Sequence, residues 1–341
     1  MNPRFALPFA LSLCSSVAGP SHAEMDRASF IALGASVLKI EVLRAQGGYA
    51  LGSGVVVRAN KVVTNCHVTR DATQIHVLRS GARWLVESQA VDMERDLCVL
   101  HTPGIKATAV TVGASRDLKL GQPVTALGYT GGMGIQNSPG DVVALHRHDA
   151  ASVIQSTNWF SSGASGGGLF DAELRLVGIL TYRLRGGAAH YFAAPTDWLE
   201  PLLDDGTRYG PVKPLARDSF PYWQKPIAMQ PNFLRAASLE RDGSWAELEA
   251  LAARWTVSDA DDAEPWYLHG LALAELNRLP DAQRALERSV HLQDASGEAW
   301  FRLGLVYHRL GLRDLAAGAR TKLAALKPEL AARLGQTLDK R

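Results

Sequence analysis

The sequence predicts a β plus α multidomain fold, in which a domain of short β-strands is followed by a domain of helices. Between residues 36 and 194, short runs rich in Val, Ile and Leu are separated by Gly, Asn and Asp. No helical segments of matching length lie between these runs, which favours a β-sandwich or β-barrel over alternating strands and helices. Beyond residue 232 the chain becomes rich in Ala, Leu, Glu and Arg, which favour helices. A length of 341 residues leaves room for two domains of ordinary size.

The composition is that of a globular protein in which positive and negative charges nearly balance. Hydrophobic residues make up 47% of the chain, and 36 basic side chains stand against 34 acidic ones. Because this balance builds no strongly basic surface, we expect no nucleic-acid partner. No apolar run approaches the roughly 20 residues that a membrane-spanning helix needs, so we also expect no membrane span.

The first residues have the order of a secretory signal peptide. Arg4 is followed by an apolar stretch at 5–13, and small residues stand at Ser21 and Ala23. A charge, then an apolar stretch, then small residues is the pattern that directs export and cleavage. We therefore interpret residues 1–23 as a signal peptide and expect the mature protein to be exported.

Between the two domains, residues 205–231 show little periodicity and are rich in proline. The prolines of this segment are Pro211, Pro214, Pro221, Pro226 and Pro231. Such a composition suits a linker or a strapping segment between domains. We therefore predict a Pro-rich linker at 205–231.

The helical part, residues 232–336, carries a pattern that returns after 34 residues. Trp266, Gly270 and Ala282 recur as Trp300, Gly304 and Ala316. This is the period of tetratricopeptide repeats, in which small residues let two antiparallel helices approach closely. Since stacked repeats form a concave surface, we predict a tetratricopeptide-like domain that binds a protein partner or substrate. Helical hairpins that do not form a repeat are the alternative.

Three segments of the strand-rich part carry residues suited to nucleophilic catalysis. They are Thr-Asn-Cys-His at 64–67, Arg-Asp-Leu at 95–97 and Gly-Ala-Ser-Gly-Gly at 163–167. A serine hydroxyl needs a base within hydrogen-bond reach, and that base needs a group that orients its other nitrogen. His67 and Asp96 can supply both groups for Ser165. The glycines around Ser165 let backbone amides point toward a developing negative charge.

In this order and in this context, the segments resemble the trypsin/chymotrypsin superfamily of serine peptidases, especially its bacterial HtrA-like branch. The matching stretches are GSGVVV (52–57), TNCHV (64–68), RDLCVL (95–100), GASGGGLF (163–170) and YFAAP (191–195). The resemblance implies a chymotrypsin-like double β-barrel over residues 30–204. It also implies His67 as general base, Asp96 as its orienting partner and Ser165 as nucleophile, with an oxyanion hole formed by the amides of Gly163 and Ser165.

The same resemblance assigns roles to four residues near the substrate. Thr181 falls where the family keeps a Ser whose hydroxyl supports the buried Asp. Tyr182 and Arg183 are expected to border the cleft in which the substrate backbone adds as a strand. Trp159 stands six residues before Ser165, where an acidic residue would select Lys or Arg, so we expect a preference for an apolar side chain.

Two cysteines remain once the signal peptide is removed, Cys66 and Cys98. Cys66 precedes His67, and Cys98 follows Asp96 by two residues, so contact between His67 and Asp96 brings the two sulfurs near each other. Export to an oxidising compartment permits a disulfide. Two buried free thiols are the alternative.

Three other interpretations are less consistent with the sequence. Residues 163–167 also fit the G-x-S-x-G motif of α/β-hydrolases, but in those enzymes an Asp and then a His follow the serine, and only His190 follows soon here. Ala164 stands where zymogen-type relatives keep an Asp, which argues against activation by N-terminal cleavage. His146 and His148 lack a third ligand, a pattern more typical of solvated histidines than of a metal site.

The sequence therefore predicts a serine endopeptidase that hydrolyses protein or peptide substrates through an acyl-enzyme, with no metal and no cofactor. The HtrA-like resemblance implies a bacterial periplasmic or secreted protein, with helical repeats in place of the PDZ modules of that branch. The alternative is a latent or inactive peptidase fold that serves as a binding scaffold.

Overall fold

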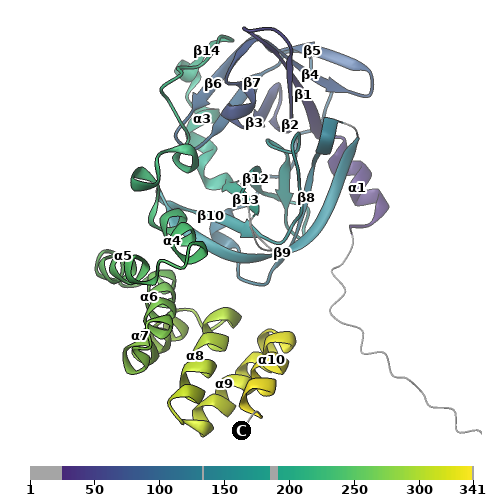
Figure 1. Ribbon diagram of the computed structural model, residues 1–341. Coiled ribbons are helices and arrows are strands. Elements are labelled where there is room, and N and C mark those ends of the chain that lie inside the picture. Colours follow the sequence, from purple (N-terminus) through teal and green to yellow (C-terminus); the bar gives the residue numbers. More distant parts are fainter. Residues whose placement is uncertain (1–24, 133, 185–190, 340–341) are drawn as a thin grey trace, which may run out of the picture.

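The computed structural model describes residues 25–132, 134–184 and 191–339, and it has the two parts that the sequence predicts (Figure 1). Strands form the N-terminal part and helices form most of the C-terminal part. The predicted signal peptide, residues 1–23, lies outside the described residues.

The first barrel is an antiparallel sheet of eight strands in the order β14-β6-β7-β3-β2-β1-β4-β5. Its strands are β1 (Val37–Arg44), β2 (Tyr49–Arg58), β3 (Lys61–Thr64), β4 (Ala72–Arg79), β5 (Ala82–Leu85), β6 (Ser88–Asp92), β7 (Leu97–His101) and β14 (Tyr209–Pro211). Between β5 and β6, the amides of Val86 and Glu87 donate to the carbonyls of Ile75 and His101. Because Ile75 lies on β4 and His101 on β7, this junction joins the two sides of the sheet.

The pairing of β3 with β7 brings two of the predicted site segments together. These strands are antiparallel, and Thr64 at the end of β3 pairs with Cys98 near the start of β7. In such a pair, the chain that leaves one strand meets the chain that enters the other. The segment after β3 is the short helix α2 (Cys66–Thr69), which contains His67, and the residue before β7 is Asp96.

The second barrel is closed, with the strand order β10-β13-β12-β11-β8-β9. Its strands are β8 (Pro123–Tyr129), β9 (Ile135–His148), β10 (Ala151–Ser156), β11 (Gly168–Phe170), β12 (Leu176–Arg183) and β13 (Tyr191–Pro195). The buried side chains of Ala126, Ile154 and Leu169 pack in a cluster of this barrel, whereas Leu127, Phe170 and Ile179 belong to a cluster that it shares with the first barrel. The loop between β10 and β11 carries Ser165, whose carbonyl accepts a hydrogen bond of 2.8 Å from the amide of Ser53 in the first barrel.

Short helices surround the two barrels. They are α1 (Arg27–Gly34), α3 (Glu200–Asp204) and the 3-10 helices η1 (Ser115–Asp117), η2 (Thr130–Gly132), η3 (Thr196–Trp198), η4 (Gly206–Arg208), η5 (Tyr222–Gln224) and η6 (Ile227–Met229). The Asp26 side chain caps α1 by accepting from the amides of Ala28 and Ser29. Helix α1 thus begins a few residues ahead of position 30, where we expected the peptidase domain to start.

The Pro-rich segment, residues 205–231, is packed against the first barrel, and we call it the strap. In Figure 1 it runs from β14 past the barrels and leads into α4. β14 pairs with β6, the amide of Leu215 donates to the carbonyl of Arg70, and Tyr222 is only 1% exposed. A flexible linker would make few such contacts, so the segment lies on the barrel as a strapping segment would, and the predicted bounds of the linker stay a prediction.

The helices of the C-terminal part form antiparallel pairs that follow a fixed period. They are α4 (Asn232–Arg241), α5 (Trp245–Ser258), α6 (Ala263–Glu275), α7 (Leu279–Leu292), α8 (Gly297–Arg309), α9 (Arg313–Leu326) and α10 (Pro328–Leu338). Adding 34 to the bounds of α6 and α7 gives the bounds of α8 and α9. A Cβ atom on Gly270 would lie 2.6 Å from Leu286, and one on Gly304 would lie 2.5 Å from Leu334, so close helix contact requires glycine at both positions. The helical repeat is thus present, and its tetratricopeptide identity stays a prediction.

The helical part contacts the second barrel through His146 on β9. This side chain is 7% exposed, so the expectation of a solvated histidine is wrong. Its ring stacks on Phe233 of α4 at 4.5 Å, Nδ1 lies 2.8 Å from Glu264 of α6, and Nε2 lies 2.8 Å from Gln155. Burial lowers the pKa of His146, but Glu264, Gln155 and Asp262 outweigh this effect and raise the pKa above its usual value.

Candidate active site

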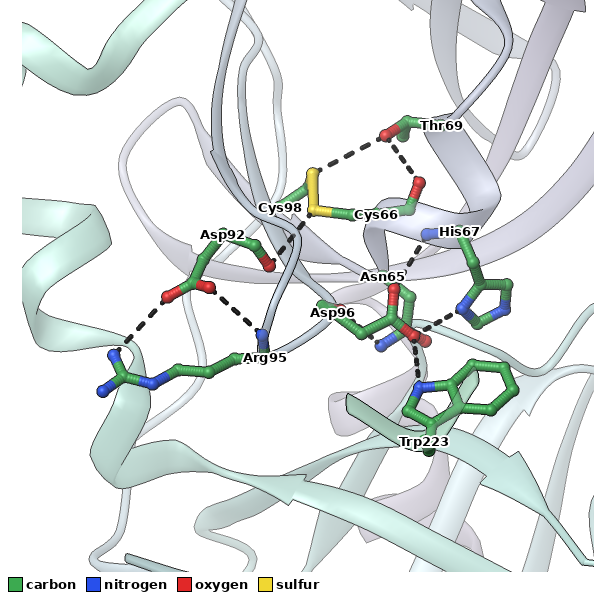
Figure 2. The surroundings of a disulfide bond; sticks show 9 residues. All are labelled: Asn65, Cys66, His67, Thr69, Asp92, Arg95, Asp96, Cys98 and Trp223. Carbon is green, nitrogen blue, oxygen red and sulfur yellow. Dashed lines mark hydrogen bonds and ion pairs between the residues drawn. A yellow bond between two sulfur atoms is a disulfide. The ribbon is translucent and has the colours of Figure 1, made fainter. Parts of the chain in front are cut away.

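His67 and Asp96 form a hydrogen-bonded pair beside the paired ends of β3 and β7 (Figure 2). Nδ1 of His67 lies 2.6 Å from Oδ2 of Asp96, and the backbone amide of His67 donates to Oδ1 over 2.8 Å. Because an ionised carboxylate can only accept hydrogen bonds, we assign the proton of the neutral ring to Nδ1. Nε2 then keeps its lone pair, which is what a general base requires.

Asp96 is fixed by a tight turn and by its burial. Its φ is +59°, a left-handed conformation that Asp tolerates better than most residues. Its amide donates to the carbonyl of Met93, and its carbonyl accepts from the side-chain amide of Asn65 over 3.0 Å. The side chain has 0% exposure, and a buried carboxylate is stable only when hydrogen-bond donors surround it.

A disulfide joins Cys66 and Cys98, which lie 32 residues apart in the sequence (Figure 2). Of the two alternatives that the sequence left open, the disulfide is thus confirmed. One sulfur belongs to the residue before His67, and the other lies on β7 just after Asp96. The bond therefore ties together the two segments that carry the hydrogen-bonded pair.

A third donor to Asp96 comes from the strap. The indole nitrogen Nε1 of Trp223 donates to Oδ2 of Asp96 over 3.2 Å (Figure 2). The Trp223 ring also meets the His67 ring edge-on at 5.6 Å and stacks on Tyr182 at 4.8 Å. Sequence reasoning missed this residue because it lies 127 positions after Asp96, in a segment without a recognisable motif.

Thr181 does not support the Asp96 carboxylate directly, so that expectation is wrong. Its hydroxyl donates to the carbonyl of Ile179 over 2.7 Å and accepts from the side-chain amide of Asn65 over 3.2 Å. Asn65 uses the same amide group to reach the backbone carbonyl of Asp96. A register shift between Leu180 and Tyr182 in the pairing of β12 with β13 accompanies this orientation. Thr181 therefore contacts the Asp96 backbone only through Asn65.

Ser165 lies in a loop whose shape depends on glycine. Gly163 and Gly166 have φ values of +97° and +85°. A Cβ on Gly166 would lie 2.1 Å from the carbonyl oxygen of Ser53, so only glycine fits there. The Ser165 hydroxyl donates to the carbonyl of Thr181 over 3.2 Å. Within the described ranges it makes no direct hydrogen bond to His67, and such bonds often tighten only when substrate is present.

The amides of this loop fall into two groups. Those of Ala164 and Gly166 donate to the carbonyls of Ser161 and Leu180. Those of Gly163 and Ser165 have no acceptor among the residues that the structure describes. Two amides without an acceptor beside a serine hydroxyl can receive the negative charge that develops on an attacked carbonyl oxygen.

Ser53 holds the opposite side of the same loop. Its hydroxyl donates to the carbonyl of Gly163 over 2.7 Å and accepts from the amide of Tyr129 over 2.8 Å. Its backbone amide donates to the carbonyl of Ser165 over 2.8 Å. Ser53 is fully buried, so these contacts fix the direction of the loop carbonyls. In the sequence, Ser53 stands within the stretch GSGVVV (52–57), where no local pattern marks this role.

The predicted cleft residues take different positions. Tyr182 is only 5% exposed and stacks between Phe192 at 4.7 Å and Trp223 at 4.8 Å, so its side chain does not border an open cleft as expected. Burial raises the pKa of Tyr182 well above its usual value, which keeps the phenol neutral. Arg183 is exposed at the end of β12. Trp159 is 53% exposed and lies at the edge of a small pocket.

Two further properties concern the described ranges as a whole. No three His, Cys, Asp or Glu side chains in them gather as metal ligands would. None of their helices is both long enough and apolar enough to cross a membrane.

Comparisons with known proteins match the N-terminal half of the chain. The family model of the trypsin-like peptidase domain matches residues 52–179. The periplasmic serine endoprotease DegP of Escherichia coli K12 is 33% identical over 176 residues, which cover 48% of this chain and 37% of DegP. The chloroplastic Protease Do-like 1 of Arabidopsis thaliana is 31% identical over 176 residues, or 47% of this chain and 40% of that protein. The chain thus spans less than half the length of these curated relatives.

A solved structure has the same fold. The active form of the Rv3671c protease from M. tuberculosis superposes with a TM-score of 0.52 at 22% identity, and the match covers 62% of this chain and 97% of that one. The residues that the family model matches include His67, Asp96 and Ser165. The N-terminal half of the chain therefore has the fold of a chymotrypsin-like double barrel, and residues 52–179 within it match the trypsin-like peptidase domain.

Proposed function

We propose that this protein is a serine endopeptidase with Ser165 as nucleophile, His67 as general base and Asp96 as the group that orients His67. The observation that carries the proposal is the 2.6 Å hydrogen bond between His67 and a carboxylate that is fully buried. Such a carboxylate fixes the tautomer and the direction of the imidazole, and it stabilises the imidazolium that forms when Ser165 loses its proton.

The reaction would follow from these positions. Ser165 turns its hydroxyl from the carbonyl of Thr181 toward Nε2 of His67 and attacks the scissile carbonyl while His67 takes the proton. The amides of Gly163 and Ser165 receive the oxyanion. His67 then gives the proton to the leaving amine, and water hydrolyses the acyl-enzyme by the same route in reverse. These steps use only side chains, backbone amides and water.

The substrate would bind beside β12 as an added strand. β12 pairs with β13 as far as Arg183, whereas its pairing with β11 ends at Ile179. In the described part of the chain, the edge at Thr181 and beyond faces no other strand on the β11 side, which suits an extended peptide. A small pocket that includes Ala164, the residue before Ser165, is lined by apolar Trp159, Phe160 and Leu180 and by polar Thr130, Gln136, Asn137 and Ser138. The apolar part of this lining supports a preference for an apolar side chain before the cleaved bond.

Two finer elements belong to the same proposal. Export to the periplasm is supported by the Cys66–Cys98 disulfide, which suits an oxidising compartment, and by the periplasmic location in the name of the E. coli relative. Recruitment of a protein substrate or partner by the helical repeat is supported by the 34-residue period of its helices.

The direct test is proteolysis of an unfolded protein such as casein by the full chain and by Ser165→Ala. We expect the variant to lose activity, because it lacks the proposed nucleophile. Ser162→Ala, in the same loop at an exposed position, is the matched control and should cleave casein at the unmodified rate. Equal activity of Ser165→Ala and the unmodified chain would refute the proposal. A folded, unmodified chain that cleaves nothing would support the alternative of a scaffold.

A further inference from the structure

The strap places Trp223 where an orienting group for the Asp96 carboxylate is needed. Oδ2 of Asp96 accepts from Nδ1 of His67 and from Nε1 of Trp223, and Oδ1 accepts from the amide of His67. Thr181, the residue expected in this supporting role, directs its hydroxyl to Ile179 instead. Apart from His67 itself, Trp223 is therefore the only described residue whose hydrogen bond restrains this carboxylate.

The Trp223 ring is itself held by the second barrel. It stacks on Tyr182 at 4.8 Å and 13°, and Tyr182 stacks on Phe192 at 4.7 Å and 6°. Tyr182 and Phe192 lie on β12 and β13, while Asp96 and His67 belong to the first barrel. The indole thus connects the acid–base pair of one barrel to the barrel that carries Ser165.

The strap is anchored next to the residue that it supports. The amide of Tyr222 donates to the carbonyl of Glu94, and the Lys225 ammonium lies 2.5 Å from the Glu94 carboxylate. On the other side, the Gln230 side chain donates to the carbonyls of Trp223 and Lys225 just before α4 begins. Trp223 is therefore fixed both near Asp96 and near the helical domain.

We propose that Trp223 is a positioning residue of the active site, which orients the Asp96–His67 pair from outside the predicted peptidase domain, residues 30–204. The inference rests on the proposed function of that pair. It makes the strap a part of the catalytic centre, so the smallest active unit extends beyond residue 204 to include residues 205–231. A change in the packing of α4 on the strap would then alter catalysis without touching the substrate.

Trp223→Phe tests the role in the full chain, because it removes the N–H donor and keeps an aromatic ring on Tyr182. Trp300→Phe is the matched control, since its Nε1 also donates a hydrogen bond, in this case to the backbone carbonyl of Asp294 in the helical domain. A hydrogen bond to a charged group corresponds to about a 10- to 100-fold effect on rate. We expect Trp223→Phe to lower kcat by this factor with KM changed less than about twofold, and Trp300→Phe to change neither constant. The kcat and KM of both variants are measured at a temperature at which circular dichroism shows that the variants are folded.

A second readout does not depend on catalysis. The proton on Nδ1 of His67 gives a strongly downfield signal in the proton NMR spectrum when it is held against a carboxylate. We expect Trp223→Phe to shift or broaden this signal and Trp300→Phe to leave it unchanged. If Trp223→Phe leaves both kcat and this signal unchanged, or raises only KM, the positioning role is refuted. If the unmodified chain proves inactive while the signal responds to Trp223→Phe, the proposed function fails and the contact to the pair stands.

Discussion

Replacement of Ser53 tests how the oxyanion loop is held. Its fully buried hydroxyl donates to the carbonyl of Gly163 and accepts from the amide of Tyr129. Ser53→Ala leaves both backbone groups without a partner, and each buried unsatisfied group costs about 1–3 kcal/mol. We therefore expect the free energy of unfolding to fall by about 2–6 kcal/mol. For a domain of this size, that corresponds to a loss of roughly 4–24 °C in Tm.

The same substitution should also lower the rate of the chemical step. Ser53 fixes the direction of the Gly163 carbonyl, and the backbone at Gly163 determines where its amide points. Loss of one oxyanion donor typically lowers kcat about 10²- to 10³-fold. Since Ser53→Ala only loosens this donor, we expect kcat to fall roughly tenfold or more, with little change in KM.

The assay combines steady-state kinetics on a chromogenic peptide with calorimetric unfolding. Ser289→Ala is the matched control, because Ser289 is 1% exposed and its hydroxyl donates to the carbonyl of Ala263, far from the loop. It should lower Tm by a similar or smaller amount and leave kcat unchanged. If Ser53→Ala lowers Tm but has the kcat of the Ser289→Ala control, Ser53 does not position the oxyanion loop and the reasoning is refuted.

Three further predictions concern stability. The double variant Cys66→Ala and Cys98→Ala should have a free energy of unfolding about 4 kcal/mol lower, because it lacks the cross-link between two residues that lie 32 positions apart. A reductant should lower the Tm of the unmodified chain but not the Tm of this variant. Gly166→Ala should abolish activity and soluble expression, because its Cβ would lie 2.1 Å from a backbone oxygen of β2, whereas Gly121→Ala, with φ at +75° but open space around it, should only lower Tm slightly. The pKa of His146 is higher in the folded chain than in the unfolded chain, where it is about 6.5. Protonated His146 therefore stabilises the fold fully below about pH 6.5, and this stabilisation is lost as the pH rises through the pKa of the folded chain. Urea unfolding should therefore show stability falling as pH rises above about 6.5, and His146→Gln should remove this dependence. A pH dependence unchanged in His146→Gln would exclude the interface histidine as its source.

The sequence was sufficient to predict those parts of the fold and of the site that depend on residues close together in the chain. His67 and Asp96 each lie within a few residues of a strand whose Val and Leu residues are easily recognised. Pairing of these strands brings the two side chains together, and the family resemblance that their motifs carry was enough to predict this contact. The 34-residue offset between helices is likewise a local pattern repeated along the chain.

The remaining parts of the site depend on contacts between distant segments. Trp223 reaches Asp96 only because the strap folds back over the first barrel, and no motif marks that path. Thr181 has the residue type expected of a supporting hydroxyl, but the register shift near it and the side chain of Asn65 redirect that hydroxyl. His146 is buried because α4 and α6 pack on β9, which the sequence around it does not indicate.

The central claim is that Ser165 is a nucleophile activated by His67. Incubation of the full chain with a fluorophosphonate probe, followed by digestion and mass spectrometry, identifies the modified residue. Modification of Ser165 is the predicted result, with a rate at least roughly a hundredfold lower in His67→Ala. The account would be contradicted by a folded chain whose Ser165 stays unmodified, or by modification of Ser165 at the same rate in His67→Ala.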